Sequence, residues 1–300
     1  CTVGHEITAT ARNTVTKRNV RILSDTLELI QRTRTFLLVT VFLAVAVISW
    51  PTVQAEKHSV DDEDASESFV GTPVRRGAFP SVGAILFEGR QICGATLINN
   101  NHVLTTADCV SFLTDTQKTN DLAKLKVYLN TVALKTYNPG AVISNVLGVK
   151  VHELYDKKTK ANNIAVLALG SNVTTLYPSS LPVDGTTDDY VGKPGTILRW
   201  GATKSATTSH KILLKAPVTI ITNEACSAKY GLKISSNFLC ASAGSQEGLT
   251  CHDDSNGGPV IVEGRQIGIM SWGKGCMDFN YPGIYMRISV YMDWIKKNSF

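Results

Sequence analysis

Cysteines constrain the fold of this chain more than any other residue type. Six of the seven lie between residues 93 and 276, and the seventh is Cys1; the six are Cys93, Cys109, Cys226, Cys240, Cys251 and Cys276. An even set confined to one region is typical of a disulfide-bonded domain made in an oxidising compartment. Positions alone leave the pairing of the six open.

The apolar pattern after residue 55 indicates a mostly β domain. Apolar runs are short and are separated by turn residues, in a chain that holds 23 glycines and 10 prolines. Residues 84–92 form an apolar run, the polar turn Glu88-Gly89-Arg90 and a second run, which predicts a hairpin. Residues 261–270 repeat the pattern around the predicted turn Gly264-Arg265. A sustained helical period occurs only in the last dozen residues.

The N-terminal region carries the pattern of a secretory signal. Phe36–Trp50 is largely apolar, follows two arginines and precedes Val53-Gln54-Ala55, so residues 36–55 are predicted to be a signal peptide cleaved after Ala55. A membrane anchor is the alternative, but the run is shorter than the roughly 20 residues that a bilayer needs. Residues 1–35 are expected to be an upstream segment without a function of its own.

Charge divides the rest of the chain into two parts. Residues 56–68 hold one basic and six acidic residues and are expected to form a solvated leader, whereas residues 69–300 carry a net charge of +7. A surface site for a polyanion is therefore possible, and Lys157-Lys158-Thr159-Lys160 is its most compact candidate, although a solvated loop is the simpler interpretation. Nothing resembles a nucleic-acid-binding module.

Residues 69–300 resemble the trypsin/chymotrypsin family of serine proteases in a series of segments that occur in the same order. FVGT resembles the activation-site IVGG, CGATLI resembles CGGSLI, HVLTTADC resembles WVLTAAHC, and NNIAVLAL resembles NDIALLKL. RWGAT resembles GWGxT, SNGGP resembles DSGGP, and SWGKGC with PGIYMRIS resembles SWGxGC with PGVYxRVS.

The resemblance implies an all-β, trypsin-like fold of two six-stranded antiparallel barrels followed by a C-terminal helix from Tyr291 to Asn298. It also selects a pairing of the cysteines, with bonds expected between Cys93 and Cys109, Cys226 and Cys240, and Cys251 and Cys276. Each bond would stabilise the fold by about 2–4 kcal/mol, mainly by restricting the unfolded chain.

Two positions of the family's catalytic triad have lost the required side chain. The chemistry needs a serine hydroxyl, an imidazole that accepts and returns its proton, and a carboxylate that orients the imidazole. The imidazole position is Asp108 and the carboxylate position is Asn163. An aspartate has a reference pKa about 2.5 units below that of histidine, so Asp108 is predicted to be a poor proton acceptor at neutral pH.

The nucleophile position depends on how CHDDSNGGP is counted, because it has one residue more than the family's CxGDSGGP. Counting from Cys251 places Ser255 there, whereas counting back from Gly257 places Asn256 there. We favour Asn256, because the spacing from Gly257 to Cys276 is family-like. The extra residue also alters the turn that aims the two oxyanion-hole amides, and it brings Asp253 or Asp254 near them.

Activation and specificity positions differ as well. Ser68 precedes Phe69, so the basic residue after which family zymogens are cleaved is missing. Leu249 stands at the floor of the primary specificity pocket, which predicts no preference for basic side chains. The walls of the specificity pocket keep the family pattern; they are Ser271, Trp272, Gly273 and Gly283.

Three smaller signals complete the prediction. Asn172 begins the N-glycosylation sequon Asn172-Val173-Thr174 in a predicted surface loop. His252 lies near Ser255 but has no carboxylate partner that could make it a replacement base. Once the cysteines are paired, no His/Cys spacing fits a metal, so neither a metal nor another cofactor is expected.

The preferred hypothesis is a secreted, non-catalytic serine protease homologue that acts by binding. Such relatives are often cofactors or decoys in extracellular protease cascades, so the resemblance implies a protease, zymogen or inhibitor as its partner, or a surface polyanion. The alternative is a weakly active serine-type endopeptidase that uses Ser255.

Overall fold

The computed structural model describes residues 71–113, 119–134, 138–183, 189–201, 212–243, 256–274 and 280–299. All of them belong to the unit Ser66–Phe300. The predicted upstream segment, signal peptide and leader, as well as Phe69, lie outside the described residues. No helix in the described ranges has the length and apolar character needed to cross a bilayer.

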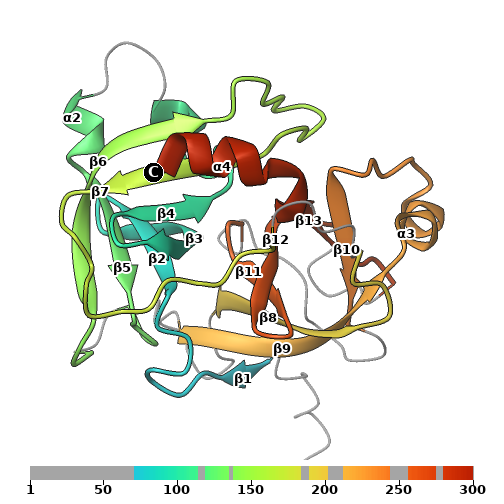
Figure 1. Ribbon diagram of the computed structural model, residues 1–300, viewed down its shortest axis with the longest axis horizontal. Coiled ribbons are helices and arrows are strands. Elements are labelled where there is room, and N and C mark those ends of the chain that lie inside the picture. Colours follow the sequence, from blue (N-terminus) through green and yellow to red (C-terminus); the bar gives the residue numbers. More distant parts are fainter. Residues whose placement is uncertain are drawn as a thin grey trace, which may run out of the picture. The chain divides into compact units, whose positions relative to one another are not determined.

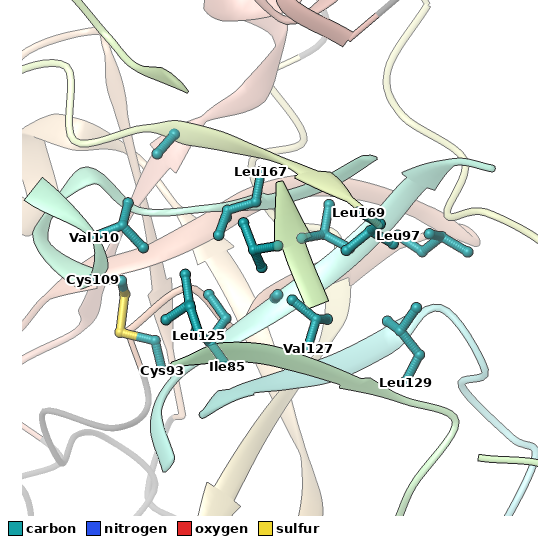
Figure 2. Close-up of a cluster of buried hydrophobic side chains, with 14 of the residues drawn as sticks. Ile85, Cys93, Leu97, Cys109, Val110, Leu125, Val127, Leu129, Leu167 and Leu169 are labelled. Carbon is teal, nitrogen blue, oxygen red and sulfur yellow. A yellow bond between two sulfur atoms is a disulfide. The ribbon is translucent and has the colours of Figure 1, made fainter. Parts of the chain in front are cut away.

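The first barrel is a closed antiparallel sheet in the order β2-β3-β4-β7-β6-β5. Its strands are β2 (Val82–Phe87), β3 (Arg90–Asn99), β4 (His102–Thr105), β5 (Leu125–Leu129), β6 (Val142–Val151) and β7 (Ala165–Leu169). Alternate side chains of these strands point inward and form one core (Figure 2), in which Leu97, Leu125 and Leu167 are fully buried. Burial of each such side chain contributes about 1.5–3 kcal/mol.

The second barrel closes in the order β8-β9-β10-β13-β12-β11, because β8 pairs with both β9 and β11. Its strands are β8 (Pro194–Gly201), β9 (Ile212–Ile221), β10 (Phe238–Ser242), β11 (Pro259–Val262), β12 (Arg265–Trp272) and β13 (Gly283–Arg287), and the short β1 (Thr72–Pro73) adds to β9. The two six-stranded antiparallel barrels confirm the expected fold (Figure 1).

Both predicted hairpins are present, and each turns through two residues. Glu88 and Gly89 join β2 to β3, and Glu263 and Gly264 join β11 to β12; all four have positive φ angles, between 49° and 77°. Two consecutive residues with positive φ match the right-handed twist of the flanking strands. The predicted first turn, Glu88-Gly89-Arg90, was one residue too long, because Arg90 begins β3. The predicted second turn, Gly264-Arg265, was displaced by one residue, because Glu263 lies in the turn and Arg265 begins β12.

Helices are short and lie between or after the strands. They are η1 (Ala107–Cys109), η2 (Ser111–Leu113), α2 (Thr119–Leu122), α3 (Asn223–Tyr230), η4 (Ile288–Tyr291) and α4 (Met292–Ser299). The predicted C-terminal helix is α4, one residue later than expected. It runs back from the second barrel to lie beside β7 of the first (Figure 1), and Asn99 Nδ2 donates a hydrogen bond to the carbonyl of Ser299.

A shared apolar cluster joins the two barrels to α4. It contains Leu104 and Ile164 from the first barrel's side, Ile269 and Met286 from the second barrel, and Ile295 from α4, all fully buried. The loop that follows β6 and the end of β12 border this cluster. Ile164 of this cluster follows Asn163 in the sequence. The barrels are therefore held together next to a position that the resemblance assigns to catalysis.

Candidate active site

Asp108 is held in place by the short helix η1 and by a disulfide. Strand β4 ends at Thr105, and η1 begins two residues later with Ala107, so Asp108 lies at the middle of the helix. The next residue, Cys109, is bonded to Cys93 of β3. This bond and the Cys226–Cys240 bond are those implied by the resemblance. Cys251 and Cys276 lie outside the described residues.

Three donors converge on the Asp108 carboxylate from the loop between β6 and β7. Lys160 Nζ lies 2.9 Å from Oδ1 and 2.8 Å from Oδ2, and Asn163 Nδ2 donates to Oδ2 at 2.9 Å. The Tyr155 hydroxyl donates a short hydrogen bond to Oδ1. The Asp108 side chain is 13% exposed and that of Lys160 is 31% exposed, so the ion pair is largely shielded from water. Both carboxylate oxygens are thus engaged by donors of this chain.

Asn163 connects this network to the second barrel. It is completely buried, its Oδ1 accepts a hydrogen bond from the backbone N–H of Asp108 at 2.8 Å, and its Nδ2 also donates to Ser271 Oγ at 2.9 Å. Because the Asn163 amide is buried, loss of one of these partners would leave a polar group with neither water nor a hydrogen bond, which costs more free energy of folding than the same loss at an exposed site. Asn163 therefore fixes the position of Asp108 relative to β12.

Tyr155 is a permanent donor to this site. Burial, together with the hydrogen bond to Asp108 and the charge of that carboxylate, raises the pKa of Tyr155 well above its ordinary value. The phenol therefore keeps its proton at any physiological pH and cannot act as a base. Chemically, the site is a neutralised ion pair with a phenol and an amide bound to it.

The expectation that the run Lys157–Lys160 is a solvated loop was wrong for Lys160. Its backbone has a φ of 57°, in the left-handed region, which turns the side chain from the exposed run toward Asp108. Sequence reasoning also missed Tyr155. The available signal was the short interval from Tyr155 and Lys160 to Asn163, in a loop that has to return the chain to β7 beside η1.

Asn256 lies at the start of the turn that leads into β11. Its carbonyl accepts a hydrogen bond from the N–H of Gly94, next to Cys93, at 2.8 Å, and the N–H of Gly257 donates to the carbonyl of Met270 at 2.9 Å. Gly257 has a φ of 82°, and a Cβ there would lie 2.2 Å from the Gly94 oxygen, so only glycine fits. Ser255, the other candidate, lies outside the described residues, as do Leu249 and His252.

The predicted walls of the specificity pocket lie on β12 and at the start of β13. Ser271 is buried, and the ring of the next residue, Trp272, meets the Tyr230 ring edge-on, with centroids 5.3 Å apart. The Tyr230 hydroxyl donates to the carbonyl of Pro282 at 2.6 Å, beside Gly283, and accepts the N–H of Lys274, beside Gly273, at 3.1 Å. One aromatic residue of α3 thus ties both walls together.

Two further predictions concern N-glycosylation and metal binding. Asn172 is exposed after β7, whereas the middle residue of its sequon, Val173, is buried in the first core. Within the described ranges, no group of three or more His, Cys, Asp or Glu side chains is arranged to hold a metal ion.

Comparisons with known proteins agree on one family. The family model described as Trypsin matches residues 68–295. The chain is 31% identical to trypsin Blo t 3 of Blomia tropicalis over 214 residues, which cover 69% of this chain and 76% of that protein. It is 30% identical to a trypsin of Sarcophaga bullata over 215 residues, 70% of this chain and 79% of that protein. Trypsin alpha-4 of Lucilia cuprina is 28% identical over 228 residues.

Proposed function

Because the chain belongs to the trypsin family of serine proteases, we propose that it is a non-catalytic member of that family, which acts by binding in an extracellular protease pathway. As a cofactor or decoy, it would engage a protease, a zymogen or an inhibitor. The trypsin-like domain would be residues 69–300, preceded by the leader 56–68.

The occupied carboxylate of Asp108 carries this proposal. A general base must have a free lone pair directed at the proton that it removes, and a pKa near the operating pH. Both oxygens of Asp108 accept from Lys160, and each accepts one further hydrogen bond, from Tyr155 or Asn163. Before Asp108 could take a proton from a nucleophile, its ion pair with Lys160 would have to break.

Asn163 supports the same proposal. In the family mechanism, a carboxylate at this position stabilises the imidazolium that forms during proton transfer. Here Nδ2 donates to Asp108 and to Ser271, so the amide is used to hold a negative side chain rather than a positive one. Loss of a triad member commonly removes most of the triad's contribution to catalysis.

Extracellular action is supported by the two disulfides, since structural disulfides persist mainly in oxidising compartments. The proposed signal peptide provides the route. Sequencing the N-terminus of the mature protein tests this part, and the proposal expects it to begin at Glu56. A mature chain that retains residues 36–50 would favour membrane anchoring instead.

The alternative function is a weakly active endopeptidase with Ser255 as its nucleophile. It is favoured by the names of the similar proteins, which are trypsins. A fluorophosphonate probe separates the two functions, because it labels only a serine that is activated as a nucleophile. An active trypsin treated in parallel shows that the probe works.

The labelling experiment needs an activated form as well as the full chain. Family zymogens require cleavage before the activation sequence, so Ser68→Arg is introduced and the variant is cleaved with trypsin. We expect no labelling of either form. Labelling that is lost in Ser255→Ala and kept in Ser236→Ala, an exposed serine used as the matched control, would establish the endopeptidase instead.

A further inference from the structure

We propose that the loop of residues 154–160 is a preformed docking surface for an acidic segment of a partner protein, a segment that also carries an apolar side chain. This inference deepens the proposed function and rests on it, since it names the chemistry of the partner. The loop projects between β6 and β7 next to the Asp108 site (Figure 1).

Internal hydrogen bonds give the 154–160 loop one conformation. The N–H of Asp156 donates to the carbonyl of Ala161 at 3.0 Å, and Asp156 Oδ1 accepts from the N–H of Lys158 at 2.8 Å. Asn162 Nδ2 donates to the carbonyl of Leu154 at 2.8 Å, which closes the base of the loop. A surface fixed in this way loses little conformational entropy when a partner binds.

The second barrel's C-terminal elements hold the base of the loop from the other side. Trp294 Nε1 of α4 donates to Glu153 Oε2 at 2.8 Å, and the Tyr291 hydroxyl donates to Asn162 Oδ1 at 3.0 Å. The His152 ring lies 5.1 Å from the Trp294 ring, and its Nδ1 accepts the N–H of Leu154. Burial lowers the pKa of His152, which keeps that nitrogen free to accept at neutral pH.

One residue of the loop and one residue at its base have positive φ angles. Lys160 has a φ of 57° and Asn162 a φ of 53°. Non-glycine residues in this region persist where the surrounding structure dictates the conformation, and they concentrate at functional sites.

Every carboxylate near the loop is engaged internally, but two of its lysines are not. Asp108 is paired with Lys160, Glu153 Oε1 lies 2.6 Å from Lys150 Nζ, and Asp156 accepts backbone N–H groups. Lys157 and Lys158 are exposed, and neither forms an ion pair with a described residue. Two exposed lysine charges therefore stand beside the loop's single exposed carboxylate, that of Asp156, so the loop presents a net positive charge to the solvent, which favours an anionic partner.

An exposed leucine distinguishes a protein partner from a polysaccharide. Leu154 is 72% exposed, at the base of the same loop as Lys157 and Lys158. A sulfated polysaccharide gains nothing from an apolar contact, whereas a peptide buries an apolar side chain and pairs its carboxylates at the rim. The surface thus fits a short acidic segment with one apolar residue.

Fluorescence anisotropy tests this with the full chain and a labelled peptide in which glutamates flank one leucine. The loop variant is Lys157→Glu/Lys158→Glu. The matched control is Lys126→Glu/Lys215→Glu, which makes the same change in net charge at exposed lysines of β5 and β9. We expect the loop variant to weaken binding at least about tenfold, the control less than about twofold, and Leu154→Ser about threefold.

The inference is overturned if both double variants weaken binding equally, which would show an effect of net charge alone, or if neither does. It is also overturned if a heparin oligosaccharide, but not the peptide, binds in a manner that depends on Lys157 and Lys158. Mass spectrometry of the peptide after each titration separates the two proposals. A cleaved peptide contradicts the non-catalytic function. An intact peptide whose affinity does not depend on Lys157 and Lys158 contradicts the docking surface only.

Discussion

The two halves of the candidate site differ in what they keep of the family pattern. On the second barrel, Ser271, Trp272 and Gly273 follow the family sequence, and Tyr230 ties the segment to Pro282. On the first barrel, the positions that the resemblance assigns to the imidazole and the carboxylate hold Asp108 and Asn163, and Lys160 completes a closed polar network. Under the proposed function, the second-barrel half keeps the family sequence, whereas the first-barrel half holds an ion pair where the family transfers protons.

This difference suggests that the polar network now serves stability. A trypsin-family site keeps its imidazole accessible and ready to change charge. Here a shielded carboxylate is neutralised by a cation 2.8 Å away and positioned by a buried amide. Buried polar networks stabilise a structure only when every member is satisfied, so removal of any one member should be costly.

The largest expected effect comes from restoring the family's aspartate in the rebuilt half. Asn163→Asp places a second carboxylate against Asp108 and removes the donor to Asp108 and Ser271. We expect the free energy of unfolding at pH 7 to fall by about 2–4 kcal/mol. The repulsion raises the pKa of the paired carboxyls in the folded state, so part of the loss should be recovered as the pH falls toward 4.

Urea denaturation at several pH values measures this effect. Asn100→Ala, at an exposed position after β3, is the control and should change stability by less than about 0.5 kcal/mol. An Asn163→Asp variant as stable as the wild type at pH 7 would mean that the first-barrel half has no closed network, and the contrast between the halves would disappear.

A smaller loss should follow when the network loses its cation. Lys160→Met keeps the length and apolar stem of the side chain but leaves Asp108 without its counter-ion. We expect a loss of about 1–3 kcal/mol, below the range for a fully buried pair because Lys160 is 31% exposed. Lys157→Met, on the exposed side of the same loop, should be neutral within about 0.5 kcal/mol.

A double-mutant cycle shows whether this loss belongs to the ion pair. Asp108→Asn removes the charge that Lys160 neutralises, so Lys160→Met should cost less in that background, with a coupling energy of about 1–2 kcal/mol. Equal costs in the two backgrounds would show that Lys160 contributes through its apolar stem alone, and would contradict the ion-pair interpretation.

The two halves also differ in how much the sequence could reveal. The barrels, the C-terminal helix and the bonds of Cys93 and Cys226 followed from the apolar pattern and the family resemblance. Both kinds of signal lie in short stretches of neighbouring residues, which can be read directly from the sequence. The pairing of Lys160 with Asp108 did not. It spans 52 positions and depends on a positive φ at Lys160, and a lysine, unlike a glycine or an asparagine, gives no sign of that conformation in the sequence. The Ser255 and Leu249 predictions stay predictions.

The smallest expected effect measures how separate the two halves are. Tyr230→Phe removes the hydroxyl that donates to Pro282 and accepts from Lys274, while the ring keeps its contact with Trp272. Each bond contributes about 0.5–1.5 kcal/mol. Lys274 is exposed, so water can replace the partner of its N–H, whereas Pro282 is buried. We therefore expect a loss of about 1 kcal/mol, chiefly from the Pro282 carbonyl.

Combining this change with Lys160→Met then tests their independence. Among the described residues, no hydrogen bond joins the two sites directly. They are linked through Asn163 and Ser271 of β12 and through the shared apolar cluster, so the two losses should add to within about 0.5 kcal/mol. A larger interaction energy would mean that β12 transmits changes between the halves. Rebuilding the first-barrel network would then have altered the specificity-pocket walls as well, and their family-like sequence would no longer imply a family-like conformation.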